Sequence, residues 1–203
     1  MKKISLIVIL FLLSLYFLAP SSKVNAQIYE EGIIETTPGA TEIIIENDAT
    51  DSGKIEYELP YPGMLPDNPF YPLKMLRDKI VKTLISDSFK KAQFNLLTGQ
   101  KRLFAGKLLI EKKKQDLAME TIEKSGHYLD DALKDIKQAQ KDNPKNVDIK
   151  PFLEHFKTVA GKHQEIIKDL KPEINKRNAV RFEKQEKRIA DILKNVEFLI
   201  EQY

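Results

Sequence analysis

The chain has 203 residues, of which 42% are apolar and 31% charged, and its formal net charge is +3. These values place it among globular proteins, with room for one ordinary domain and accessory segments. The sequence contains no cysteine, which excludes disulfide bonds and a lipoprotein-type lipid anchor. The apolar core must therefore supply the stability of the domain.

Residues 1–26 have the pattern of a secretory signal peptide. Lys2 and Lys3 precede an apolar run of sixteen residues, 4–19, and small residues then lead to Ala26. We predict cleavage before Gln27 and a secreted or extracytoplasmic location in the cell envelope. The alternative is an uncleaved membrane anchor, but the run is shorter than the about 20 residues that a spanning helix usually needs.

We predict that residues 27–57 form an acidic linker that is mostly disordered. Residues 27–58 hold nine acidic side chains against Lys54 alone, a net charge of −8, and a short apolar run at 43–45. An isolated strand is not stable, and like charges extend the chain. The alternative is that the isoleucines of this run dock on the domain as an edge. Residues 59–203 carry a net charge of +8.

A proline-rich segment, residues 58–72, contains five of the ten prolines. Its apolar residues argue against a solvated tether, and no basic residue closely flanks its Pro-x-x-Pro spacings, which argues against a polyproline ligand. We predict a rigid strap that packs along the domain and leads into the first helix. The residues assigned to this strap are Leu59, Pro60, Tyr61, Pro62, Gly63, Leu65, Pro66, Pro69, Tyr71 and Pro72.

From residue 73 onward the apolar spacing predicts five amphipathic helices. They cover residues 73–85, 88–113, 116–141 and 149–170, and, after a break at Lys171-Pro172, a last segment whose apolar stripe runs from Phe182 to Tyr203. Ser86-Asp87 offers a cap and a turn before the second helix, and Asp148 is the expected N-cap of the fourth. Each apolar face must be buried, including that of Leu76, Ile80 and Leu84 in the first helix. We therefore predict that residues 58–203 form an all-α, antiparallel bundle of about five helices.

Small residues recur in the second helix at steps of seven, at Ala92, Gly99 and Gly106. They lie beside large apolar residues of the same spacing, which predicts a seam where another helix approaches closely. The alternative is that Gly99 ends the helix, because an interior glycine costs about 1 kcal/mol relative to alanine. We predict a continuous helix.

No motif in the sequence predicts catalysis or a cofactor. There is no cysteine nucleophile, nucleophile elbow, phosphate-binding glycine loop or zinc-binding histidine pair. His155 and His163 are about 12 Å apart along a helix, and His163 fits a buried seam position better than a metal ligand. Asp130 and Asp131 fit a solvated helix face. We therefore expect no enzyme and no cofactor.

Basic residues recur along the second helix and predict a basic face of low specificity. Its candidate binding residues are Lys90, Lys91, Lys101, Arg102, Lys112, Lys113 and Lys114, with Lys184, Lys187 and Arg188 on the last helix. In an exported protein the available polyanions are envelope polymers and lipid headgroups, not nucleic acid. The acidic linker could compete for the same face.

A family resemblance is carried by residues 59–80, 87–97 and 101–109, which read LPYPGMLPDNPFYPLKMLRDKI, DSFKKAQFNLL and KRLFAGKLL. Over residues 58–140 the chain resembles an uncharacterised exported helical domain family, domain of unknown function 5667. Asn68 stands where the family commonly has serine, and Gly99 and Gly106 stand where it more often has alanine or a polar residue. The resemblance implies an extracytoplasmic helical domain and no activity or ligand.

Together these features favour an exported, non-catalytic interaction or sensor module of the cell envelope. Its expected partner is an envelope protein or an anionic envelope polymer, with membrane contact peripheral at most unless the signal peptide is retained. The alternative is a structural or stress-protective envelope protein that binds misfolded clients or anionic polymers. A metal-dependent enzyme would need carboxylates and histidines clustered around His163, which the spacing does not predict.

Overall fold

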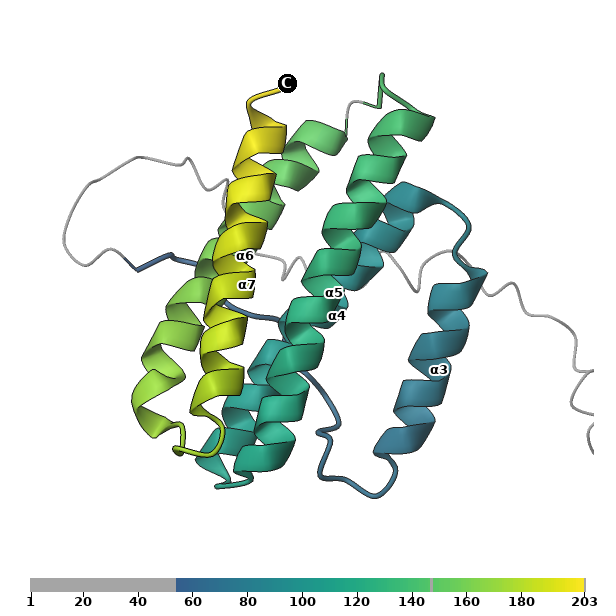
Figure 1. The fold of residues 1–203 in the computed structure, drawn as a ribbon. Helices are drawn as coiled ribbons and strands as arrows, with labels where there is room; N and C mark the ends of the chain where they lie inside the picture. The colour runs from purple at the N-terminus through teal and green to yellow at the C-terminus, as the bar shows by residue number, and fades with distance from the viewer. Residues whose placement is uncertain (1–53, 147, 203) are drawn as a thin grey trace, which may run out of the picture. The chain divides into compact units, whose positions relative to one another are not determined.

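Five α-helices and a short 3₁₀ helix make up the described part of the computed structural model, residues 54–146 and 148–202 (Figure 1). They are α3 (Tyr71–Leu84), α4 (Ser88–Glu111), α5 (Gln115–Asp142), α6 (Ile149–Leu170), η1 (Lys171–Glu173) and α7 (Ala179–Ile200). These residues contain no strand, so the all-α prediction is confirmed. The predicted signal peptide and the predicted linker up to residue 53 lie outside the described residues. No helix within the described ranges is long and apolar enough to cross a membrane.

The helices begin and end close to the predicted residues, and local hydrogen bonds stabilise some of these ends. The Asp87 carboxylate accepts a hydrogen bond of 2.7 Å from the backbone N–H of Lys90, as expected for the N-cap of α4. Asp148 occupies the N-cap position of α6, as predicted, but its side chain makes no capping hydrogen bond. Between α4 and α5 the chain reverses through Lys113, whose φ of 59° lies in the left-handed region.

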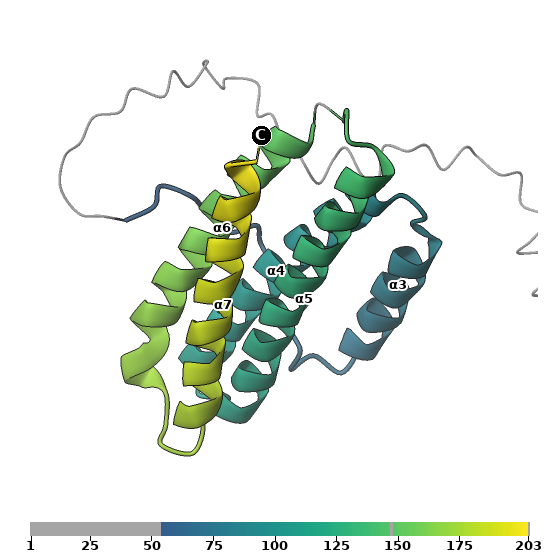
Figure 2. The same ribbon diagram turned by 45° about the horizontal axis from the view of Figure 1, so that its top comes forward.

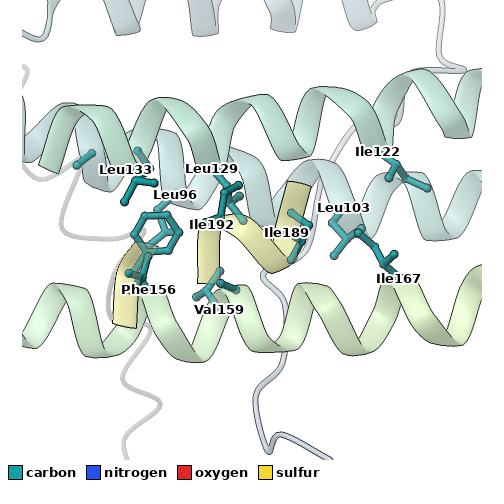
Figure 3. Close-up of a cluster of buried hydrophobic side chains, with 14 of the residues drawn as sticks. Leu96, Leu103, Ile122, Leu129, Leu133, Phe156, Val159, Ile167, Ile189 and Ile192 are labelled. Carbon is teal, nitrogen blue, oxygen red and sulfur yellow. The ribbon is translucent and has the colours of Figure 1, made fainter. Parts of the chain in front are cut away.

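The four helices α4 to α7 enclose the apolar core. Helix α4 packs most extensively on α5, α6 packs on α7, and further contacts join α5 to α7 and α4 to α6. Consecutive helices run antiparallel (Figures 1 and 2). Leu129 and Phe156, which the sequence pattern places in the core, have no exposed surface. Figure 3 shows them among side chains from all four helices, including Leu96, Leu103, Val159, Ile189 and Ile192.

Glycines permit the close approach of α4 and α5. A Cβ atom at Gly106 would lie 2.5 Å from Cγ1 of Ile122 and 3.4 Å from the backbone oxygen of Ala118. A Cβ atom at Gly99 would overlap the Leu129 side chain and lie 3.3 Å from the backbone oxygen of Ser125. Helix α4 is continuous through both positions. The predicted seam and the predicted continuity are therefore confirmed.

The prediction that all five apolar faces are buried is wrong for the first helix. Helix α3 has no buried residue, and it lies beside the bundle at the right of Figure 1. Leu76, Ile80 and Leu84 remain more than half exposed. The physical reason is that the opposite, polar face of α3 contacts α4 and α5. The core consequently belongs to four helices, and α3 is attached to their side.

Candidate functional site

The outer face of α3 presents a row of aliphatic side chains that no described residue covers. We call this row the α3 stripe; it consists of Leu73, Leu76, Ile80 and Leu84, whose exposed fractions lie between 51% and 74%. Their spacing places them on one face of the helix. Phe70, at the N-cap, is 63% exposed. A contiguous exposed apolar surface of this kind commonly marks an interaction site.

The inner face of α3 is held by Arg102 of α4, which is only 5% exposed. One terminal nitrogen of its guanidinium, Nη1, donates a hydrogen bond of 2.7 Å to the hydroxyl of Tyr71, and Nη2 lies 2.6 Å from the Met75 sulfur. The guanidinium carbon lies 5.7 Å from the Tyr71 ring centroid and 5.4 Å from that of Tyr128. Arg102 therefore joins α3 to α5 through α4 by cation–π and hydrogen-bond contacts.

A second polar contact fixes the C-terminal half of α3. The Lys82 ammonium lies 2.6 Å from a carboxylate oxygen of Asp131 and 5.1 Å from the Tyr128 ring centroid. Lys82 is on the same face as Tyr71 and Met75, because these positions repeat at helical spacing. Both ends of the inner face are thus bound to α4 and α5, and the α3 stripe points away from them.

Lys74 connects α3 to the segment that precedes it. Its ammonium donates hydrogen bonds of 2.7 Å and 3.2 Å to the backbone oxygens of Pro62 and Met64. Partial burial lowers the pKa of Lys74 below its ordinary value, and burial raises the pKa of the Tyr71 hydroxyl although Arg102 opposes this. These groups form a partly desolvated polar layer under α3.

Residues 58–70 make several contacts with the bundle, although they contain no helix. Leu59 packs against the core and Pro62 is buried, whereas Tyr61 is largely exposed and makes a T-shaped ring contact with Phe104. Gly63 has a φ of 67°, which favours glycine at this turn. The other residues that the sequence assigns to the strap before α3 are partly buried or exposed: Pro60, Leu65, Pro66 and Pro69.

The chain joins the bundle before residue 58, which differs from the predicted linker boundary. The backbone N–H of Ile55 donates to the Glu165 carboxylate at 2.9 Å, and its backbone oxygen accepts from the Lys162 ammonium at 2.9 Å. The Ile55 side chain fills the space beside Gly161. A Cβ atom added to Gly161 would lie 2.5 Å from Cδ1 of Ile55. Two residues later, Tyr57 donates a hydrogen bond of 2.6 Å to the side chain of Gln100.

The predicted basic face is not one continuous surface. Arg102 is buried under α3, contrary to its expected place on a solvated face. Lys112 and Lys114 lie 3.1 Å and 2.9 Å from the Asp67 carboxylate, and their hydrogen bonds lower the pKa of Asp67. Lys90 is exposed at the start of α4, Lys91 and Lys101 are partly buried, and Lys113 is exposed in the turn.

The described residues contain no cluster of three or more potential metal ligands. His163 is fully buried in α6, and burial lowers its pKa to about 3. Two shallow depressions of about 450 and 590 Å³ lie at the α4–α5 turn and beside Ile55. Neither is lined by a histidine, and neither adjoins the α3 stripe.

A family profile described as Domain of unknown function (DUF5667) matches residues 63–197. The match begins within the proline-rich segment and includes most of α7, so it extends well beyond the 58–140 range that the resemblance covers. The last two helices therefore belong to the family domain, which corrects the narrower expectation. No curated protein and no solved structure matches the chain.

Proposed function

The chain belongs to the DUF5667 family, and from this premise and the arrangement of α3 we propose that it is an exported, non-catalytic interaction module of the cell envelope. Export is the prediction from residues 1–26. The family description names no activity, so the argument for function depends on the residues themselves. The observation that carries the proposal is the α3 stripe.

The α3 stripe is exposed because the opposite face of the helix is specifically held. Arg102 contacts Tyr71 and Met75, and Lys82 pairs with Asp131. Rotating α3 to bury the stripe would break these contacts and leave the buried Arg102 guanidinium without its hydrogen-bond acceptor. The exposed orientation is therefore the favoured one, and an external component can cover the stripe without unfolding the bundle.

We further propose that residues 54–70 act as a strap that positions α3. Tyr57 hydrogen-bonds Gln100, Asp67 pairs with Lys112 and Lys114, and Lys74 of α3 binds the backbone at Pro62. These contacts fix the point at which the chain enters α3. The proline-rich sequence supports this role, because prolines reduce the conformational entropy lost when an extended segment is ordered.

Crosslinking in the envelope fraction tests the proposed function. The full chain is compared with a Leu76→Glu/Ile80→Glu variant, after washes at low and high salt. The control is Val180→Glu, at a residue of α7 that is 76% exposed. Since neither α3 residue is buried, the melting temperatures should agree. We expect a defined crosslinked product that the α3 variant loses and the control retains.

Identical crosslinking of all three proteins would contradict the role of α3. A broad set of products, equally strong for the α3 variant, would instead favour the stress-protective alternative, in which many misfolded clients bind through charged helix faces.

A further inference from the structure

The positive charge of the bundle gathers in the part of the chain that contains α3. From Tyr71 to Lys107 there are nine lysines and arginines but only two acidic residues, Asp78 and Asp87. This segment accounts for seven of the eight net positive charges of residues 59–203. The side chain of Asp78 is only 14% exposed and pairs with Arg77, so it adds little negative charge to the outer surface.

Basic side chains border the α3 stripe. Arg77 and Lys79 are both exposed, and the Arg77 guanidinium, which also pairs with Asp78, belongs to a side chain that is 70% exposed. At 100° per residue, Arg77 adjoins the stripe on one side and Lys79 flanks it on the other. Long basic side chains in these positions can rest their methylene groups along an apolar layer while their charges reach a polar one. The helix thus combines an aliphatic ridge with basic flanks.

A second copy of the chain is a poor occupant for this ridge. Pairing two α3 helices would bring two basic segments together, which is electrostatically unfavourable. A stable dimer generally buries about 1,200 Å² or more, and each copy would contribute only four partly exposed aliphatic side chains. The charge pattern instead favours a partner surface that is both apolar and anionic.

We propose that α3 binds the surface of an anionic lipid bilayer, with the α3 stripe entering the boundary between headgroups and acyl chains. This inference rests on the proposed function and adds a lipid surface to the envelope partner that the module contacts. A helix of 14 residues is about 21 Å long, which suits it to lie in the plane of the interface and not to span it. A convex ridge needs no groove in its partner, and anionic headgroups supply the charge that its basic flanks attract.

The contacts of Arg102 and Lys82 determine which face of α3 meets the bilayer. They hold the polar face of α3 on α4 and α5, so the stripe is presented before any lipid is met. The bundle core is not required to open, because α3 contributes no buried residue to it.

A fluorescent probe at a single cysteine tests the proposal in the full chain, which contains no natural cysteine. Ile80→Cys is labelled with an environment-sensitive fluorophore, and Phe198→Cys on α7, at a position that is 61% exposed, is the matched control. Both are mixed with vesicles of phosphatidylcholine, with or without about one-third phosphatidylglycerol. The readout is the environment of residue 80, because the apolar segment 4–19 could itself retain the chain on vesicles.

We expect a blue shift and about a twofold or larger rise in emission at residue 80 with anionic vesicles, weakened by high salt and absent at residue 198. Adding Leu76→Gln and Leu84→Gln to the labelled protein should abolish the change while leaving its melting temperature unaltered. No change at residue 80, or equal changes at both positions, would overturn the proposal.

A shift that appears without vesicles and grows with protein concentration would also overturn it, in favour of self-association. If the vesicle experiment fails while crosslinking still yields an α3-dependent protein partner, the lipid inference falls and the proposed function stands.

Discussion

His163 lies fully buried on the apolar face of α6, between Val159 and Ile167 along the helix. Among the described residues neither of its ring nitrogens has a hydrogen-bond partner. The desolvation that lowers its pKa to about 3 favours the neutral imidazole. Such a residue contributes no chemistry to the α3 surface, but it makes the stability of the bundle depend on pH.

The sign of this dependence follows from the two states. In the unfolded chain a histidine has a pKa of about 6.5, whereas the folded value is about 3. Between these values the unfolded state binds a proton that the folded state does not, so the contribution of His163 to stability falls as the pH falls. From pH 7.5 to pH 5 the loss is about 2 kcal/mol, with each unit of pKa worth about 1.4 kcal/mol.

Urea unfolding of wild type and His163→Met at the two pH values measures this term. Methionine fills a similar apolar space, and titration of the other groups is common to both proteins. We expect the variant to lose about 2 kcal/mol less than wild type on acidification. Equal losses would show that residue 163 is not buried as a neutral imidazole.

At the scale of the elements, α4 and α5 illustrate packing that depends on the absence of a side chain. Gly99 faces the buried Leu129 and the backbone of Ser125, whereas a Cβ atom at Gly126 of α5 would lie 2.8 Å from Cδ of Arg188 and 2.8 Å from Oε1 of Gln185. Alanine should improve the helix propensity at either position by about 1 kcal/mol. Only at Gly99 would the new methyl group force the helices apart.

Gly99→Ala should therefore destabilise the bundle by about 1–3 kcal/mol, because overpacking outweighs the gain in propensity. Gly126→Ala should destabilise the bundle less than Gly99→Ala, because the new methyl group would meet only side-chain atoms of Arg188 and Gln185 and no backbone atom. Chemical unfolding at neutral pH checks both variants. A stabilised Gly99→Ala protein would mean that α4 and α5 lie farther apart than described.

At the scale of the whole molecule, periodicity predicted the helices well but could not identify which face of α3 is covered. The five segments and the glycine seam follow from local spacing, which secondary structure expresses directly. The orientation of α3 depends on Arg102, whose contacts with Tyr71 and Tyr128 link residues far apart in the sequence. One signal was present: Arg102 lies seven residues from both Asn95 and Leu109, which are also buried.

The contact of Ile55 with the bundle also could not be predicted from local sequence patterns. Residues 54–57 carry one base and one acid, Lys54 and Glu56, and directly follow the acidic segment, so the sequence pattern assigns them to the linker. Their packing depends on Gly161, Lys162 and Glu165, more than one hundred residues away. Charge pattern alone could not distinguish a solvated acidic segment from one whose isoleucine fits beside a helix glycine.

The central claim is that α3 turns its apolar stripe outward and its polar face toward α4 and α5. The most direct test measures the rates at which a thiol reagent modifies single cysteines at Ile80, Met75 and Leu129 in the folded chain. We predict rapid modification at Ile80, at least several-fold slower modification at Met75, and modification at Leu129 only through unfolding. Protection at Ile80 together with rapid modification at Met75 would mean that α3 buries its stripe, and would contradict the account.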